Sequence, residues 1–321
     1  KPLQPNQTVW DNVGKMRNRG FEAEVSYNKS INKDFGFNVA FNMSAIKNKM
    51  TELDGDVSYI GLPTSVIHSL NFDQEVSRSA IGQPIGSFYA YKEDGLFQSE
   101  AEIKSYTNNK GELLQPNAKP GDIKFVDVNG DGVIDGNDRD YIGNPLPDVT
   151  AGLTLGVNFH NFDLSLFFQG MFGNDVYDLT RYVRSDGGDF YNQSQYNKNS
   201  RVVNAWTPTN TNTDIPRVTM DDPNNNIRPS SYYVQDASFV RLKNMKIGYS
   251  VPQSILSKIK FNSLYIYAQA TNLFTITGYD GIDPEVGLQS YSSDYRNLDM
   301  GVDRGIYPLS RTFTFGVNVS F

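Results

Sequence analysis

One acidic stretch of the chain combines the residue types and the spacing of a cation-binding loop. Residues 127–138 read Asp-Val-Asn-Gly-Asp-Gly-Val-Ile-Asp-Gly-Asn-Asp. In a twelve-residue calcium loop, oxygen ligands come from positions 1, 3, 5, 7, 9 and 12, and glycine at position 6 allows a sharp turn. The predicted metal ligands are Asp127, Asn129, Asp131, the backbone carbonyl of Val133, Asp135 and Asp138, and Gly132 lies at position 6.

Two features separate this loop from a calcium sensor. Asp138 stands where such loops usually have a bidentate glutamate, so we expect weaker calcium binding or a smaller divalent cation such as magnesium. No helical pattern flanks the loop, which predicts a cation that clips the chain rather than one that moves helices. The alternative is an acidic turn in which Asp and Asn side chains cap their own backbone and stay solvated.

Other groups that carry chemistry are few. The chain has no Cys and only two histidines, His68 and His160, so neither a thiolate nor a histidine cluster is available. Among 36 Asp and Glu residues, adjacent carboxylates such as Asp221 and Asp222 arise by chance, and nothing in the sequence sets their pKa values apart. We therefore expect a protein that is not an enzyme.

The composition excludes some partners and some folds. The 321 residues carry a net charge of −7, which argues against nucleic acid as a partner. No run approaches the roughly 18 consecutive apolar residues of a transmembrane helix. Aromatic residues make up 13% of the chain, with 20 Phe and 19 Tyr, an enrichment typical of strands and of the aromatic belts of membrane barrels.

The elements that must position these residues are strands. Over residues 148–172 apolar residues fall on every second position, with a tight turn at Asn161. Side chains of a strand point alternately to opposite faces, so this segment is predicted to be an amphipathic hairpin. The same alternation marks residues 21–28, 35–43, 264–271 and 311–321.

Connections of very different length join these strands. Residues 30–34 and Asn161 predict short turns, whereas residues 47–71, 174–230 and 272–305 are long and polar. Smaller expected features are a turn at 12–20, short helices at 100–106 and 252–260, and a β-bulge at 243–244. Such asymmetry is typical of outer-membrane barrels. Residues 174–230 are our candidate for contact with a ligand or partner.

Several segments resemble the SusC/RagA-like family of TonB-dependent transporters. They include the acidic segment 121–135, Ile142-Gly-Asn-Pro-Leu-Pro-Asp148, Phe168-Gln-Gly-Met-Phe-Gly-Asn-Asp-Val-Tyr177, Ala270-Thr-Asn-Leu-Phe274, Gly278-Tyr-Asp-Gly-Ile-Asp-Pro-Glu285 and the closing strand 313–321. The order of the segments along the chain also resembles that of the family.

This resemblance implies an all-β fold, the C-terminal part of an antiparallel 22-stranded transmembrane β-barrel with long extracellular loops. Residues 1–321 then form barrel wall, residues 121–140 form the acidic calcium-type loop within it, and the N-terminal plug and earlier strands lie outside this chain. The resemblance also implies a multi-pass protein in the outer membrane of a Gram-negative bacterium. By the same resemblance, such a protein imports glycans or oligopeptides with energy from TonB. TonB acts through the N-terminal part, which lies outside this chain.

The expected partners follow from the same resemblance. They are the remaining barrel strands and plug, a SusD-like surface lipoprotein, TonB and outer-membrane lipid. Unpaired strand edges cost several kcal/mol per backbone group in lipid, so we expect the missing strands to pair with this chain. The alternative is a secreted, calcium-binding β-sandwich that binds carbohydrate, which requires shorter strands and an apolar core closed on itself.

Overall fold

A seven-stranded antiparallel sheet dominates the computed structural model, which describes residues 14–61, 75–183, 200–287 and 298–321. The strand order is β1-β2-β9-β10-β13-β14-β16, so the strands of this sheet lie side by side in the order in which they occur in the chain. The strands are β1 (Gly14–Ser30), β2 (Phe35–Leu53), β9 (Val149–Phe159), β10 (Phe162–Phe172), β13 (Phe239–Ser250), β14 (Ser263–Thr277) and β16 (Thr312–Ser320).

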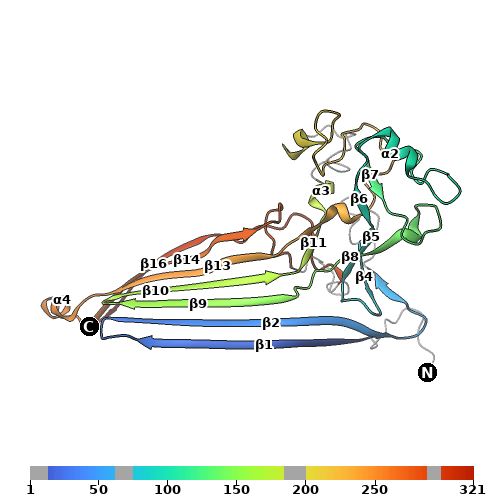
Figure 1. Cartoon of the computed structure of the whole chain (residues 1–321). Coiled ribbons are helices and arrows are strands. Elements are labelled where there is room, and N and C mark those ends of the chain that lie inside the picture. The colour runs from blue at the N-terminus through green and yellow to red at the C-terminus, as the bar shows by residue number, and fades with distance from the viewer. Residues whose placement is uncertain (1–13, 62–74, 184–199, 288–297) are drawn as a thin grey trace, which may run out of the picture.

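The two ends of the sheet differ, as predicted. At one end the connections are residues 31–34, residues 160–161 and a segment that contains α4 (Gln253–Ile259). At the other end, three long excursions leave the sheet: residues 54–148, 173–238 and 278–311. Figure 1 shows the long strands running side by side and the excursions gathered beyond one end of them. We call this gathered region the loop body.

One face of the sheet is apolar across its strands. The register aligns Val39, Leu155, Leu166, Met245, Ala270 and Phe313 in one row across six strands. A second row contains Phe35, Phe159, Phe162, Tyr249, Ile266 and Val317. Many of these side chains are exposed, for example Phe313 at 62% and Phe159 at 53%. The alternation in the sequence therefore builds a continuous apolar surface.

The opposite face is polar and rich in glycine. Asn38, Gly156, Ser165, Lys246, Gln269 and Thr314 form one row across six strands. Neighbouring side chains cover two of its glycines: a Cβ on Gly156 would lie 1.9 Å from Oδ1 of Asn38, and one on Gly316 would lie 2.2 Å from Cζ of Tyr267. Glycine is therefore required where large side chains lie flat across this face.

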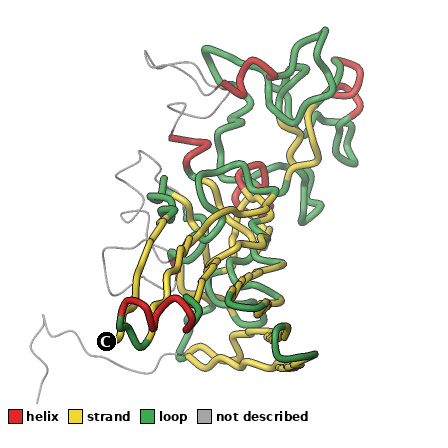
Figure 2. The backbone as a smooth tube through the Cα atoms, turned by 90° about the vertical axis from the view of Figure 1, so that its left-hand side faces the viewer, coloured by secondary structure: helices red, strands yellow, loops and turns green. Residues whose placement is uncertain are grey.

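The loop body is built from small elements. Its strands are β3 (Tyr59–Gly61), β4 (Ser77–Ala80), β5 (Ser87–Tyr91), β6 (Glu93–Leu96), β7 (Ile123–Phe125), β8 (Arg139–Gly143), β11 (Asp175–Asp178), β12 (Val234–Asp236) and β15 (Val302–Asp303). Its helical turns are α2 (Glu100–Ser105), α3 (Thr180–Val183), η2 (Gly136–Asp138), η3 (Ser200–Asn204) and η4 (Ser231–Tyr233). No helix in the described segments is long and apolar enough to span a membrane. Figure 2 shows the short helices scattered among loops.

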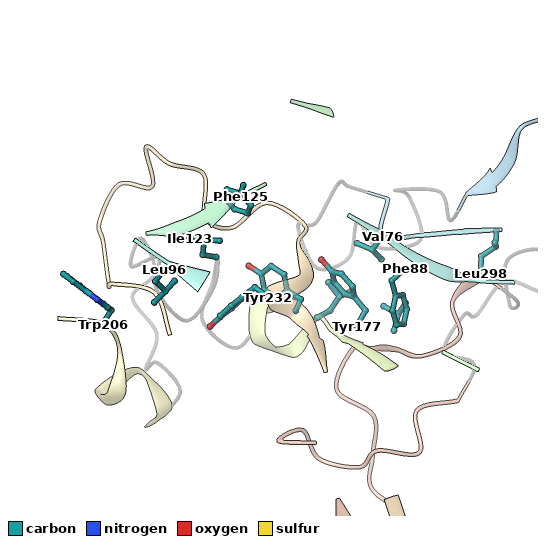
Figure 3. Packing of buried hydrophobic residues seen from close by; sticks show 12 residues of the cluster. Val76, Phe88, Leu96, Ile123, Phe125, Tyr177, Trp206, Tyr232 and Leu298 are labelled. Atoms are coloured by element: carbon teal, nitrogen blue, oxygen red, sulfur yellow. The ribbon is translucent and has the colours of Figure 1, made fainter. Parts of the chain in front are cut away.

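The principal hydrophobic core of the chain lies in the loop body and not in the large sheet. All three excursions contribute buried side chains to it, as Figure 3 shows. Its buried members are Val76, Phe88, Leu96, Ile123, Phe125, Tyr177, Leu179, Trp206, Tyr232, Tyr233, Leu298 and Val302. The three excursions therefore fold as one packed unit at one end of the sheet.

Three predicted boundaries were wrong in the same way. Residues from Gly14 onward, expected in a turn, belong to β1; β2 continues past Lys47 to Leu53; and β14 continues past Thr271 to Thr277. In each case the backbone ladder continues after the apolar alternation stops. The helices at 100–106 and 252–260 and the bulge at 243–244 are confirmed.

Candidate functional site

The acidic loop is closed by hydrogen bonds between its own side chains and backbone. The Asp138 carboxylate is fully buried and accepts from the backbone N–H groups of Val128, at 2.9 Å, and Asp135, at 2.7 Å. The Asp127 carboxylate accepts from Gly130 N–H at 2.8 Å and from Gly132 N–H at 2.9 Å. Asp138 thus joins the two ends of the loop, and Asp127 ties its start to its middle.

The other predicted ligands cap single turns of the loop. Oδ1 of Asn129 accepts from Asp131 N–H, Oδ1 of Asp131 from Val133 N–H, and Oδ1 of Asp135 from Asn137 N–H. Over the described residues, no group of three or more His, Cys, Asp or Glu side chains is placed to hold a metal ion. These contacts match the alternative given in the sequence analysis, an acidic turn whose side chains cap their own backbone. Calcium binding stays a prediction.

A set of charged side chains joins the second and third excursions. The Asp280 carboxylate accepts from Arg181 at 2.9 Å and from Arg201 at 3.2 Å. Arg181 also donates to the backbone carbonyl of Tyr232 at 2.9 Å. Burial opposes the ionisation of Asp280, but the two guanidinium groups hold its pKa below its ordinary value. The carboxylate therefore stays charged at neutral pH and holds segments about 80–100 residues apart together.

Next to this junction lies a polar pocket of about 850 Å³. The first excursion supplies one wall and the second excursion supplies the others. The lining residues are Glu93, Asp94, Gly95, Leu96, Gln98, Arg181, Thr211, Asn212, Thr213, Asp214, Ser231, Tyr232, Val234 and Gln235. Such a set of hydroxyl, amide and carboxylate groups suits a ligand with many hydrogen-bonding groups.

Two contacts hold the walls of this pocket in place. Nε1–H of Trp206 donates to Oε1 of Gln98 at 3.0 Å, which links the second excursion to the first. Ser231 accepts through its hydroxyl from the backbone N–H of Glu93 at 3.0 Å. Trp206 and Leu96 also belong to the buried core, so the pocket is built on the packed part of the loop body.

A buried arginine anchors the third excursion to the sheet. Arg241 on β13 is only 2% exposed, and its guanidinium donates to Asp283 at 2.5 Å and to Glu285 at 2.8 Å. It also donates to the hydroxyl of Thr275 at 2.7 Å. Lys243 contacts the same Glu285 carboxylate at 2.8 Å. Several charge-assisted bonds thus fix the loop that follows β14.

The polar face of the sheet carries a second set of functional groups. The ammonium of Lys246 lies 4.9 Å and 5.0 Å from the ring centroids of Tyr265 and Tyr267. The two tyrosine rings stack with centroids 5.8 Å apart, and the Tyr265 hydroxyl donates to Asp163 at 3.0 Å. Stacked aromatic rings beside a cation and an anion form a surface that a polar solute can contact.

The sequence missed the residues of the junction and the pocket. Arg181 and Arg201 belong to no recognisable motif, and their only signal was the length of the polar segment 174–230. Asp280 lies in the family-like segment 278–285, but nothing in that segment indicates its two arginine partners. Residues 184–199 of that segment, and His68, lie outside the described residues. His160 lies in the β9–β10 turn with a φ of +52°, and its ring packs edge-on against Phe159.

The arrangement as a whole defines a class of protein. A sheet with one apolar face, short turns at one end and long structured loops at the other is the wall of an outer-membrane β-barrel. In this architecture the apolar face contacts lipid, the polar face lines the lumen and the long loops are extracellular. The strands β1 and β16 lie at the two edges and do not pair with each other within the described residues.

Comparison with known proteins agrees with this class. TonB-dependent receptor P3 of Formosa agariphila is 37% identical over 97% of this chain and 29% of its own length. TonB-dependent receptor P26 of the same organism is 32% identical over 99% of this chain and 31% of its own length. TonB-dependent receptor SusC of Bacteroides thetaiotaomicron is 26% identical, covering 98% and 27%. No family model matches the chain.

Solved structures show the same fold. The structure of the RagAB peptide transporter matches 97% of this chain and 30% of its own, with a TM-score of 0.69 and 24% identity. The RagAB peptide importer in its 'open-open' state also matches with a TM-score of 0.69, at 23% identity. The chain spans less than a third of the length of these relatives.

The chain belongs to the SusC/RagA-like family of TonB-dependent receptors. The resemblance seen in the sequence and the predicted all-β fold are thereby confirmed, and the sandwich alternative is not needed. Proteins of this family reside in the outer membrane of Gram-negative bacteria, which is the location of this protein.

Proposed function

We propose that this chain forms part of the wall and the extracellular loops of an outer-membrane importer that takes up glycans or oligopeptides. The observation that carries the proposal is the combination of a lipid-facing apolar sheet with a packed loop body at one end of it. The wall separates lipid from a polar lumen, and the loop body offers ligand groups above that lumen. The chain acts by binding and passage and has no catalytic role.

We propose that the remaining strands and the plug come from other parts of the same receptor. Edge strands β1 and β16 leave backbone groups without partners, and such groups are costly in lipid. Pairing with further strands satisfies them and closes the barrel. Energy from TonB then reaches the plug, so that this chain provides a passive wall.

The loop body is the proposed surface for a SusD-like surface lipoprotein. It projects from the end of the sheet that faces outward, and it has a core of its own that keeps its shape. The name of the RagAB peptide transporter refers to a two-part assembly, and SusC is a named relative, which supports a partner of this kind.

Extraction tests the location and the partner together. We expect the full-length receptor to need detergent for extraction, to migrate differently on a gel before and after boiling, and to co-purify with a lipoprotein encoded by the same organism. Release by salt or carbonate without detergent contradicts the proposal. Asp280→Asn, which weakens the loop junction, is expected to lower the yield of the lipoprotein, whereas Asp163→Asn on the lumenal face leaves it unchanged.

The substrate class is tested by uptake. We expect a deletion strain to lose growth on either an oligosaccharide or an oligopeptide fraction larger than porins admit, and the wild-type gene to restore it. In the restored strain, Gln98→Ala and Gln235→Ala in the polar pocket are expected to reduce uptake of that fraction. Uptake that is independent of the receptor for both fractions contradicts the proposal.

We also propose that the acidic loop binds calcium through Asp127, Asn129, Asp131, Asp135 and the carbonyl of Val133. The support is the twelve-residue spacing with a glycine of positive φ, +90°, at position 6. Asp127 and Asp138 each accept two backbone N–H groups, but only Asp138 is fully buried, so Asp138 holds the loop together while it completes the predicted ligand set. Terbium luminescence, displaced by calcium and lost in Asp127→Asn, tests the site, with Asp140→Asn as the control.

A further inference from the structure

Four basic side chains stand together on the lipid-facing side of β1 and β2. The register places Arg19 opposite Lys47 and Arg17 opposite Lys49. They share the face of Phe21 because alternate residues of a strand point to the same side. All four are exposed, and none of them makes an ion pair with any described residue. We call them the basic cluster.

The basic cluster begins where the apolar band ends. On β2 the band runs from Phe35 to Ala45, which is ten steps along the strand, or about 33 Å at about 3.3 Å per residue. With a strand tilt of about 40°, this length spans about 25 Å of membrane, the height of the lipid-facing band of outer-membrane barrels. Ala45 aligns with Phe21 and Val149, and Arg19 and Lys47 are the next residues outward. The cluster therefore lies at the headgroups of the leaflet nearest the loop body.

Repulsion within the cluster indicates an absent counter-charge. Like charges directly opposite on neighbouring strands destabilise a sheet, and two such pairs follow one another here. The adjoining Glu52 is already paired with Lys15 at 2.5 Å. A groove of about 690 Å³ lies at the cluster, lined by Arg17, Arg19, Gly20, Ala45, Lys47, Lys49, Asp148 and Val149. Four cations and the one carboxylate of Asp148 leave three positive charges in that groove.

We propose that the groove binds the phosphorylated headgroup of a lipid of the outer leaflet. The headgroup phosphate lies between the two cation pairs, and the acyl chains lie along the apolar face below, over Phe21, Val25 and Phe41. Arginine and lysine are the residues that bind phosphate at membrane surfaces. The proposal rests on the outer-membrane location of the family and not on import, so failure of uptake leaves it standing.

Exchange into defined lipid tests the groove. The full-length receptor is extracted in detergent and placed in phosphatidylcholine nanodiscs that contain phosphorylated lipid A, and bound lipid is counted by native mass spectrometry. The variant Arg19→Gln/Lys47→Gln is expected to bind lipid A roughly ten- to thirty-fold more weakly, at about 1 kcal/mol per basic residue. The matched control is Lys29→Gln, the lone cation of the same face near the opposite end of β1, which is expected to bind as the wild type does.

Each contrary result has a definite meaning. Unchanged binding of lipid A by Arg19→Gln/Lys47→Gln overturns the proposal. An equal loss of lipid A binding in Lys29→Gln also overturns it, because such a loss indicates a general effect of charge. Displacement of lipid A by inorganic phosphate shows that the groove binds phosphate without its lipid, and equal binding of dephosphorylated lipid A shows that no phosphate is recognised. Either result overturns the proposal. Loss of fold is checked in phosphatidylcholine alone, where removal of the repelling pair is expected to leave the thermal midpoint at or above that of the wild type. The variant Arg17→Gln/Lys49→Gln repeats the test at the second pair.

Discussion

The large sheet and the loop body handle the same kinds of apolar side chain in opposite ways. In the sheet, Phe315 is 81% exposed and Val25 is 67% exposed, because the solvent on that face is lipid. In the loop body, Phe88, Tyr177 and Tyr233 are fully buried, because the solvent there is water. A stretch of barrel wall therefore needs no core within the chain, whereas loops that project into water must build their own.

The source of stability differs accordingly. The sheet is held by its backbone ladder and by the cost of exposing that ladder to lipid. The loop body is held by packing of its aromatic side chains, for example the edge-on contact of Phe88 with Tyr177 at 5.8 Å, and by ion pairs. Four experiments test this division, in order of decreasing effect.

Truncation of a phenylalanine is expected to affect the two regions very differently. Phe88→Ala leaves a cavity in a water-exposed body and is expected to destabilise it by about 3–5 kcal/mol. Phe315→Ala exchanges one lipid contact for another and is expected to cost about 0.5–1 kcal/mol. Hydrogen exchange of the amides of Tyr177 and Val302 reports the first, and the thermal midpoint of the barrel reports the second. Equal costs contradict the comparison.

Arg241 connects the two regions, so its removal separates them. Arg241→Ala leaves the Asp283 and Glu285 carboxylates without their guanidinium partner and is expected to cost about 3 kcal/mol, as for other broken buried pairs. Lys243→Ala loses a more exposed contact to the same Glu285 and is expected to cost well under 1 kcal/mol. Protease cleavage in residues 278–287 with an intact barrel is the measured outcome. Loss of the barrel in Arg241→Ala contradicts the assigned role.

Charge on the lipid face tests the facing of the sheet. Leu155→Arg is expected to cost about 2–4 kcal/mol if this row lies near the bilayer midplane. Thr154→Arg places the same side chain on the lumenal face, next to Phe167 and Ala40, and is expected to be tolerated. The yield of heat-modifiable receptor in the outer membrane is the measurement. Similar yields for the two variants mean that the faces are assigned wrongly.

Acid is expected to weaken the loop body before it affects the sheet. The folded-state pKa of Asp280 lies below its ordinary 3.8, so its stabilising charge is fully present above about pH 4 and is lost as the pH falls through the folded-state pKa. Because the carboxylate is about half exposed, the effect is expected to be below about 1 kcal/mol. The protection of residues 280–283 against hydrogen exchange, corrected for the intrinsic exchange rate at each pH, is expected to fall below about pH 4 in the wild type and to change less in Asp280→Asn.

Most strands of the large sheet could be predicted from the sequence, because the alternation of apolar and polar residues is a local pattern. The period of two over 148–172, 35–43 and 311–321 fixes both the strand and the face, because lipid imposes one requirement on every outward residue. The same rule failed at the ends of β1, β2 and β14. Beyond the lipid band nothing requires alternation, yet the hydrogen-bonded ladder continues.

The candidate sites also differ in whether the sequence revealed them, depending on how far apart their residues lie in the chain. The acidic loop 127–138 was found from spacing alone, since all its contacts lie within twelve residues. The polar pocket and the Arg181–Asp280–Arg201 junction were not found, because their members come from excursions about 80–140 residues apart in the chain. The basic cluster also escaped notice, since Arg17 and Arg19 meet Lys49 and Lys47 only through the register of β1 with β2.

By itself, then, the sequence determined that the chain consists of amphipathic antiparallel strands with long polar connections at one end, because a two-residue period and turn residues act locally. That these strands form a membrane wall came from the resemblance to a family and not from the period. Tertiary structure alone decided that the three excursions fold into one body with its own core, that Arg241 fixes that body to the wall, and that four cations face lipid together. Those features depend on register and on packing between distant segments, which no local pattern specifies.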